Sequence, residues 1–193
     1  MLPTCLPGRY LVVDAASASG WARVTGSPLG HAPSPVPYVD DVGECSIWTA
    51  APDIVCQQAA QDGCEAMVIE VPSPASLGIG GPTTILGIGK AVGIWQRAWE
   101  LACRAVGRKG KGIVDVEVMT VSWRPVILGS GHAGPEWKAA ALRHCRGVWG
   151  HAHFIDRVVG EEIPDALCLA EYALCSLTLA DAMDPKRLTQ LGW

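Results

Sequence analysis

Two short apolar runs, each followed at once by an acidic residue, most constrain the fold of this chain. Residues 10–13 (YLVV) precede Asp14, and residues 66–69 (AMVI) precede Glu70. An uncharged run of this length is typical of a buried strand. Asp14 and Glu70 would then stand at the ends of two strands, where ligands bind in open α/β sheets.

A long helix is expected after the second run. Apolar residues recur at alternating intervals of 3 and 4 over residues 83–106, at Ile85, Ile88, Val92, Trp95, Trp99, Ala102 and Val106. This spacing places them on one face of a helix. The turn at residues 108–112 (RKGKG) would end it.

The remaining segments complete an α/β pattern. Further strands are expected at residues 21–25, near 37–39, at 46–49 and at 113–121, and further helices at 52–62, 134–145 and 163–183. This order predicts a mixed sheet flanked by helices, antiparallel at its start and parallel afterwards. The length of 193 residues predicts a single domain, with residues 1–9 as a loose lead-in.

Composition excludes several classes of protein. Hydrophobic residues make up 49% of the chain and charged residues 18%, which excludes a disordered chain. The net charge of −4 excludes a polycation that coats nucleic acid or membranes. None of the eight cysteines forms a CxxC pair, so we expect reduced thiols in the cytoplasm, or in the host cytoplasm if the chain is viral. Neither a secretory signal nor a membrane span is expected, because Glu171 and Asp181 interrupt the most apolar stretch.

A second pair of acids opens the last expected helix. Glu162 and Asp165 are three residues apart and would share one helix face. Taken alone, they are also explained by ordinary helix capping, since Pro164 suits a first helical turn and acids there are favoured by the helix dipole. Together with Asp14 and Glu70, they could hold two Mg²⁺ ions, which prefer carboxylate oxygens and assist phosphodiester cleavage.

Five segments, in matching order between about residues 10 and 183, resemble the motifs of the RuvC-type Holliday junction resolvases. They are residues 12–22 (VVDAASASGWA), 68–70 (VIE), 86–93 (LGIGKAVG), 123–133 (WRPVILGSGHA) with Lys138 after it, and 162–170 (EIPDALCLA). The resemblance implies a ribonuclease-H-like fold, with a mixed five-stranded sheet flanked by helices, and a homodimer that cuts branched DNA.

The resemblance also implies the roles of individual residues. The acids that catalyse cleavage and hold two Mg²⁺ ions, with Mn²⁺ as a substitute, would be Asp14, Glu70, Glu162 and Asp165. Arg124 and Lys138 would hold the DNA phosphate that is cleaved. Glu161 beside Glu162 leaves the choice of the third acid open. The eight tryptophans and the Pro-rich segment 26–46 suggest a divergent branch of the family, such as a viral one.

Cationic residues lie on the long expected helix. Lys90 and Arg97 are seven residues apart, and Arg104 continues the series. They are candidates for contacts with DNA phosphates, although a solvated helix face explains them equally well. Lys90 also ends a segment like a phosphate-binding loop, but Thr84 replaces the required glycine and Ala91 the required Ser or Thr, so no nucleotide cofactor is expected.

The same helix carries a second apolar strip. Ile94 and Leu101 lie off the main apolar face, with Ala91 and Ala98 beside them. We expect two copies of the chain to pack along this strip across a two-fold axis. The alternative is that the strip lies under the Pro-rich segment 26–46.

Two other classes of function remain open from the sequence. The chain could be a non-catalytic DNA-binding or scaffolding module of the same fold, although all four acids are present. An actin-like phosphotransferase also has an acid at a strand end, but 193 residues are too few for two such lobes.

Overall fold

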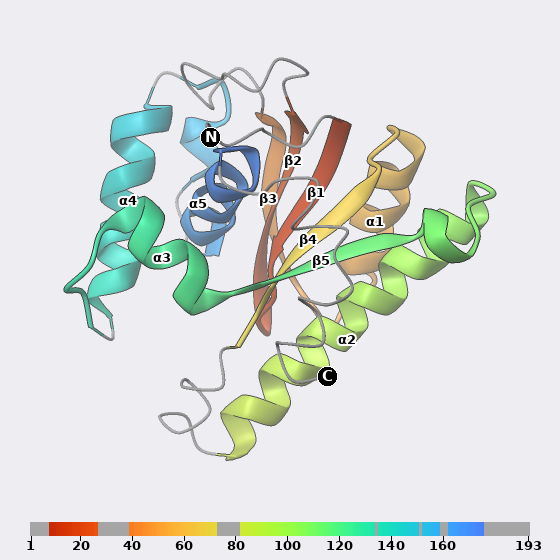
Figure 1. The fold of residues 1–193 in the computed structure, drawn as a ribbon, viewed down its shortest axis with the longest axis horizontal. Coiled ribbons are helices and arrows are strands. Elements are labelled where there is room, and N and C mark those ends of the chain that lie inside the picture. Colours follow the sequence, from red (N-terminus) through yellow and green to blue (C-terminus); the bar gives the residue numbers. More distant parts are fainter. Residues whose placement is uncertain are drawn as a thin grey trace.

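A five-stranded mixed sheet separates two layers of helices in the computed structural model of this chain (Figure 1). The structure describes residues 8–26, 39–72, 82–133, 135–150, 152–158 and 162–175. The sheet has the order β3-β2-β1-β4-β5. Its strands are β1 (Gly8–Asp14), β2 (Ala18–Gly26), β3 (Val39–Ser46), β4 (Ala66–Val71) and β5 (Val114–Met119). The first three strands pair antiparallel, whereas β1, β4 and β5 run parallel, which confirms the expected mixed sheet.

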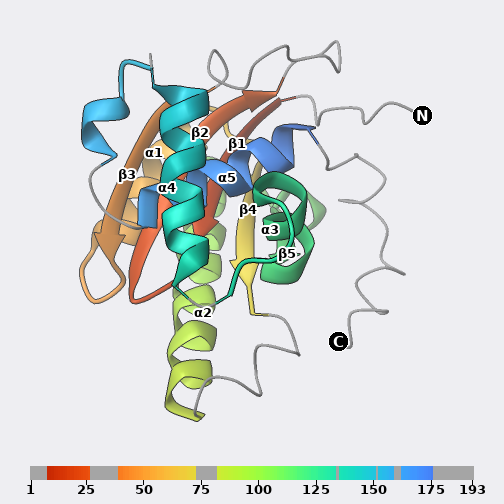
Figure 2. The ribbon, with the colours of Figure 1, turned by 90° about the vertical axis from the view of Figure 1, so that its left-hand side faces the viewer.

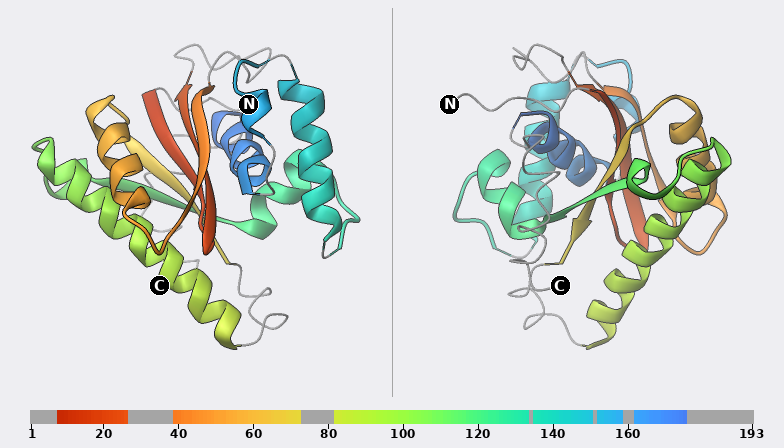
Figure 3. Two further views of the ribbon diagram at one scale, coloured as in Figure 1. Left: turned by 180° about the vertical axis from the view of Figure 1, so that it is seen from behind. Right: turned by 45° about the vertical axis from the view of Figure 1, so that its right-hand side comes forward.

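Helices cover both faces of the sheet. One layer contains α1 (Ala51–Gln61) and α2 (Pro82–Ala105). The other contains α3 (Thr120–Leu128), α4 (Glu136–Trp149) and α5 (Glu162–Cys175). Figure 2 looks onto this second layer, and Figure 3 shows α1 and α2 on the opposite side. Two single-turn helices, Gly110–Gly112 and Ile155–Arg157, lie in connecting segments.

The alternation of side chains along the strands decides which layer each acid faces. Val12 of β1 and Val68 of β4 belong to the core beneath α3, α4 and α5. Residues two apart on a strand face the same side of the sheet. Asp14 and Glu70, each two residues further along, therefore face this same layer.

The main apolar face expected for α2 is confirmed in the middle of the helix. Its side chains that pack against the sheet and α1 include Val92, Trp95, Trp99 and Ala102. The second apolar strip does not form an exposed surface as predicted. Two of its four residues, Ala91 and Ala98, are buried in the same core. The core-facing surface is wider than the 3–4 spacing indicated, and of the proposed strip only Leu101 is exposed, while Ile94 is half-buried.

Two elements differ from the sequence prediction. The expected strand at residues 113–121 ends at Met119, and α3 follows without a loop. This helix contains Pro125 and several β-branched residues, which disfavour helix formation in isolation. The third strand is Val39–Ser46, which lies between the two segments predicted at 37–39 and 46–49. Its acidic residues and Gly43 give it little intrinsic strand preference, and its place at the sheet edge tolerates them.

The last helix forms where it was expected. α5 begins at Glu162, and residues 163–170 are all buried against the sheet and α4. Residues 176–183 of the predicted helix, and most of the predicted lead-in, lie outside the described residues. Within the described ranges, no helix has both the length and the apolar character needed to cross a membrane.

Candidate functional site

The four predicted acids come together between the sheet and α5. Asp14 ends β1, Glu70 is the next-to-last residue of β4, and Glu162 and Asp165 stand in the first turn of α5. Asp14 is 7% exposed, Glu70 8% and Asp165 0%, whereas the Glu162 side chain is 22% exposed. Ionisable groups are rarely buried this deeply, so this cluster is the candidate functional site of the chain.

A glycine brings the start of α5 to the end of β1. Gly20 of β2 lies directly opposite Asp14 in the antiparallel pair. A Cβ atom at position 20 would lie only 2.0 Å from the main-chain oxygen of Glu162. Only glycine permits this approach, and this explains the glycine in the Ser-Gly-Trp sequence that follows the first acid.

The electrostatics of Asp14 show how closely the acids are grouped. Burial raises its pKa well above the ordinary value, and the charges of Glu70 and Asp165 raise it further. The Lys138 ammonium opposes this shift, and Glu162 adds to it. The four carboxylates thus act on one another as like charges in a poorly solvated space.

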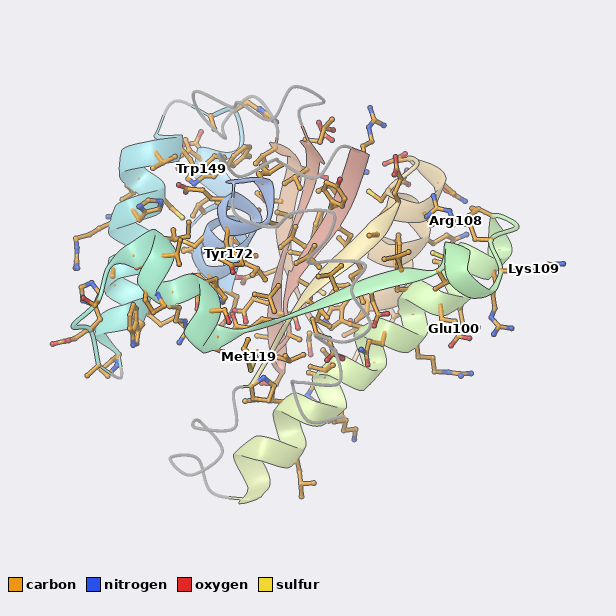
Figure 4. The ribbon with its side chains drawn as sticks, viewed as in Figure 1. Glu100, Arg108, Lys109, Met119, Trp149 and Tyr172 are labelled. Atoms are coloured by element: carbon orange, nitrogen blue, oxygen red, sulfur yellow. The ribbon has the colours of Figure 1, made fainter. Side chains whose placement is uncertain are left out.

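Glu70 is held by two donors from α3. The Thr120 hydroxyl donates a hydrogen bond of 2.6 Å to Oε1, and the Trp123 indole N–H donates one of 2.7 Å to Oε2. Burial raises the pKa of Glu70, and the Arg124 guanidinium and the Thr120 hydrogen bond offset part of that increase. Figure 4 labels Met119, the last residue of β5, at the point where the chain enters α3.

Two cations lie among the acids. The Lys138 ammonium of α4 is 3.0 Å from Glu162 Oε2 and 3.1 Å from Asp165 Oδ2. The Arg124 guanidinium is 3.2 Å from Asp165 Oδ2 and 3.8 Å from Glu70 Oε1. Together they partly neutralise the cluster and link α3, α4 and α5 around it.

The cations and acids also shift one another's pKa values. Burial raises the pKa of Asp165, and Lys138 and Arg124 oppose the increase. For Lys138, burial alone would lower the pKa, but Asp165, Asp14 and Glu162 outweigh it and raise that pKa above its ordinary value. Lys138 is therefore a fixed positive charge in this site.

The donor chemistry of the cluster fits Mg²⁺. Four carboxylates offer the hard oxygen ligands that this ion prefers. The Oδ1 atom of Asp165 is buried, and no described residue donates a hydrogen bond to it, so a bound cation would satisfy it. As the described side chains stand, no three acids, histidines or cysteines are grouped to hold an ion, and the Lys138 ammonium bridges Glu162 and Asp165 instead. A metal ion would therefore take the place of this ammonium.

Two of the predicted DNA-binding residues lie away from the acids. Lys90 and Arg97 are exposed on α2, which packs on the other face of the sheet. The Lys90 ammonium lies 4.4 Å from the centre of the exposed Trp48 ring. The role of Lys90 and Arg97 in DNA binding remains a prediction. Glu161, the alternative third acid, lies outside the described residues.

Thr120 and Trp123 were missed by sequence reasoning. The predicted strand at residues 113–121 contains Thr120, whereas Trp123 falls after its end, so nothing in the prediction linked the two residues. A helix starting at residue 120 would have placed them three apart on one face, next to the end of a strand. Recognising α3 was therefore the signal that could have identified them.

Known structures share this fold. No protein-family model and no curated protein sequence matches the chain. Thermus thermophilus RuvC in complex with a Holliday junction substrate superposes with a TM-score of 0.53 at 17% identity, over 84% of this chain and 90% of that one. The Fowlpox virus resolvase in complex with Holliday junction DNA superposes with a TM-score of 0.51 at 8% identity, over 86% of this chain and 96% of that one. The yeast mitochondrial Holliday junction resolvase gives 0.52 at 9% identity, over 89% and 80%. The chain thus has the fold of the RuvC-type resolvases, which confirms the expected ribonuclease-H-like architecture.

Proposed function

We propose that this chain is a metal-dependent endonuclease that cleaves branched DNA such as Holliday junctions. The observation that carries the proposal is the convergence of four carboxylates from β1, β4 and α5, with two cations among them, in a resolvase fold. The three resolvases described above support the choice of branched DNA, since two of them are complexes with it.

Each residue of the cluster has a role in this proposal. Asp14, Glu70, Glu162 and Asp165 would hold two Mg²⁺ ions, with Mn²⁺ as a substitute. Bound Mg²⁺ supplies Lewis-acid stabilisation of the attacking and leaving oxygens. A water oxygen bonds to phosphorus as the bond to the 3′ oxygen breaks, which leaves 5′-phosphate and 3′-hydroxyl ends.

Lys138 and Arg124 act on the phosphate in the same proposal. In the structure both are engaged with carboxylates that would serve as metal ligands. Once these carboxylates bind metal, the ammonium and guanidinium groups are available to the phosphate oxygens. They would then balance the negative charge that develops there during cleavage.

We also propose a homodimer that contacts DNA phosphates through α2. This helix extends beyond the sheet (Figures 1 and 2) and leaves Leu86 73% and Leu101 47% exposed. Lys90 and Arg97 lie on the same exposed stripe, by their helical spacing. Two apolar side chains with cations between them suit a contact between copies that also borders DNA.

A junction-cleavage assay tests the proposed function. A synthetic four-way junction is incubated with the protein and Mg²⁺, with linear duplex, EDTA and Asp14→Asn as controls. Paired nicks in the junction, dependent on metal and on Asp14, are the expected result. Binding without cleavage in Mg²⁺ and in Mn²⁺ would favour a non-catalytic DNA-binding module, and ATP hydrolysis would favour a phosphotransferase.

A further inference from the structure

The carboxylate of Glu70 has a hydrogen-bond donor on each of its two oxygens. The Thr120 hydroxyl bonds to Oε1 at 2.6 Å and the Trp123 indole to Oε2 at 2.7 Å. Rotating the carboxylate about its terminal bond would break both contacts. Each carboxylate oxygen has two lone pairs, so one on each oxygen remains available to a cation.

Both donors come from the first turn of α3, whose position follows from strand register. β4 and β5 pair in parallel, with Glu70 opposite Val118 and Val71 opposite Met119. The residue that follows Met119 is Thr120, so α3 starts beside Glu70. Trp123, three residues later, lies on the same helix face and reaches the other oxygen.

We infer that Thr120 and Trp123 are positioning residues, which fix the orientation of the Glu70 carboxylate for metal binding. This inference rests on the proposed nuclease function. Residues that hydrogen-bond a metal ligand without contacting the metal commonly contribute ten- to a hundredfold to metal affinity or activity. Thr120 and Trp123 would do so without contacting metal or DNA.

Burial of the Trp123 indole alone does not account for the contact. Trp149 is also fully buried, and no described residue accepts a hydrogen bond from its Nε1 atom. Among the described residues, a second buried indole thus stands without an acceptor.

Substitutions that remove one donor at a time test the inference. Thr120→Val removes the hydroxyl at nearly constant volume, and Thr120→Ser restores it. Trp123→Phe removes the indole N–H, and Trp149→Phe is the matched control for loss of indole volume in the same core. Calorimetric titration with Ca²⁺ alone measures metal affinity, and junction cleavage in Mg²⁺ gives kcat and KM separately.

We expect Thr120→Val and Trp123→Phe each to weaken Ca²⁺ binding about ten- to a hundredfold and to lower kcat with little change in KM for DNA. The Ca²⁺ affinity and kcat of Thr120→Ser and Trp149→Phe should stay near those of the unmodified protein. Unchanged Ca²⁺ affinity in Thr120→Val would overturn the inference. It would also be overturned if Thr120→Ser bound Ca²⁺ as weakly as Thr120→Val, or if Trp149→Phe lost as much Ca²⁺ affinity as Trp123→Phe.

The two readouts separate this inference from the proposed function. A protein that shows the expected Ca²⁺ differences but does not cut junctions would refute the nuclease and keep the positioning role. A protein that cuts junctions equally well in all four variants would keep the nuclease and refute the positioning role. Absence of Ca²⁺ binding and of cleavage in the unmodified protein would refute both.

Discussion

The α-carbon of Gly20 faces the main-chain oxygen of Glu162 so closely that a methyl group at position 20 would lie 2.0 Å from that oxygen. Through this contact β2 sets where α5 begins. Because Gly20 pairs with Asp14, the contact also sets how near the two acids of α5 come to Asp14.

The first prediction concerns this contact. Gly20→Ala should destabilise the protein by about 1–3 kcal/mol, because main chain must shift to admit the methyl group. Cleavage should fall more than the loss of folded protein explains, since the shift moves Glu162 and Asp165. Urea unfolding and junction cleavage measure the two effects.

Gly89→Ala provides the matched control. Gly89 is exposed in the interior of α2, and nothing lies within 4 Å of the added methyl group. Alanine there should stabilise the helix by about 0.5–1 kcal/mol. If Gly20→Ala is as stable and active as Gly89→Ala, the close contact does not position the site.

The second prediction is that Asp14→Asn abolishes cleavage while the protein stays folded and still binds junction DNA. The amide has nearly the same volume but lacks the charge needed to bind a divalent cation. Cleavage gels and circular dichroism give the two readouts. Near-normal cleavage by this variant would remove Asp14 from the proposed metal site.

The third prediction concerns pH in the absence of metal. Burial, Glu70 and Asp165 raise the pKa of Asp14 well above its ordinary value of 3.8. The folded state therefore keeps a proton that the unfolded state has lost, so the free energy of unfolding falls as pH rises through the raised pKa. Asp14→Asn removes the part of this pH dependence that comes from Asp14.

Urea unfolding in EDTA between about pH 5 and pH 8 checks the sign. The unmodified protein should lose more stability over this range than Asp14→Asn does. Mg²⁺ should reduce the difference, because a bound cation compensates the ionised carboxylates. Parallel pH profiles for the two proteins would show that Asp14 ionises as it does in the unfolded chain.

The fourth prediction separates two neighbouring glutamates. Glu162 Oε2 lies 3.0 Å from the Lys138 ammonium, which places its carboxylate in the acidic cluster. Glu162→Gln should therefore lower the rate of junction cleavage far more than Glu161→Gln. The opposite ranking would show that Glu161 is the third acid.

The sequence predicted most of the acidic site because its signals are local. An apolar run followed by an acid indicates a strand end, and two acids three residues apart indicate a shared helix face. Those rules led to Asp14, Glu70, Glu162 and Asp165, which the structure brings together. They require no knowledge of how distant segments pack.

The remaining features depend on tertiary packing. Pro125 and its β-branched neighbours give residues 120–128 little helix preference, so the sequence does not predict α3. The helix forms because it follows directly on β5 and packs against α5. Hydroxyl and indole donors such as Thr120 and Trp123 have no characteristic spacing. The spacing of Lys90 and Arg97 indicates a common helix face but not which side of the sheet that helix covers.

The fifth prediction concerns assembly through α2. The exposed residues Leu86 and Leu101 replace the strip first expected for a dimer contact. Leu86→Glu with Leu101→Glu should give a folded monomer that makes single nicks in a junction. Light scattering gives the mass, and a mass of one chain for the unmodified protein at micromolar concentration would contradict the dimer.

The division of the core into two layers also bears on how this chain can change over generations. All four acids and both cations of the cluster belong to the sheet and to the α3–α5 layer. None of these groups comes from α1 or α2, whose core residues are mostly apolar and fill the volume against the opposite face. Many combinations of apolar residues can fill such a volume, except at Trp95, whose indole donates a hydrogen bond to Ser19 Oγ. Random mutagenesis confined to the core residues of α1 and α2 should therefore yield many active clones, whereas the same mutation load in α3 and α5 should yield few.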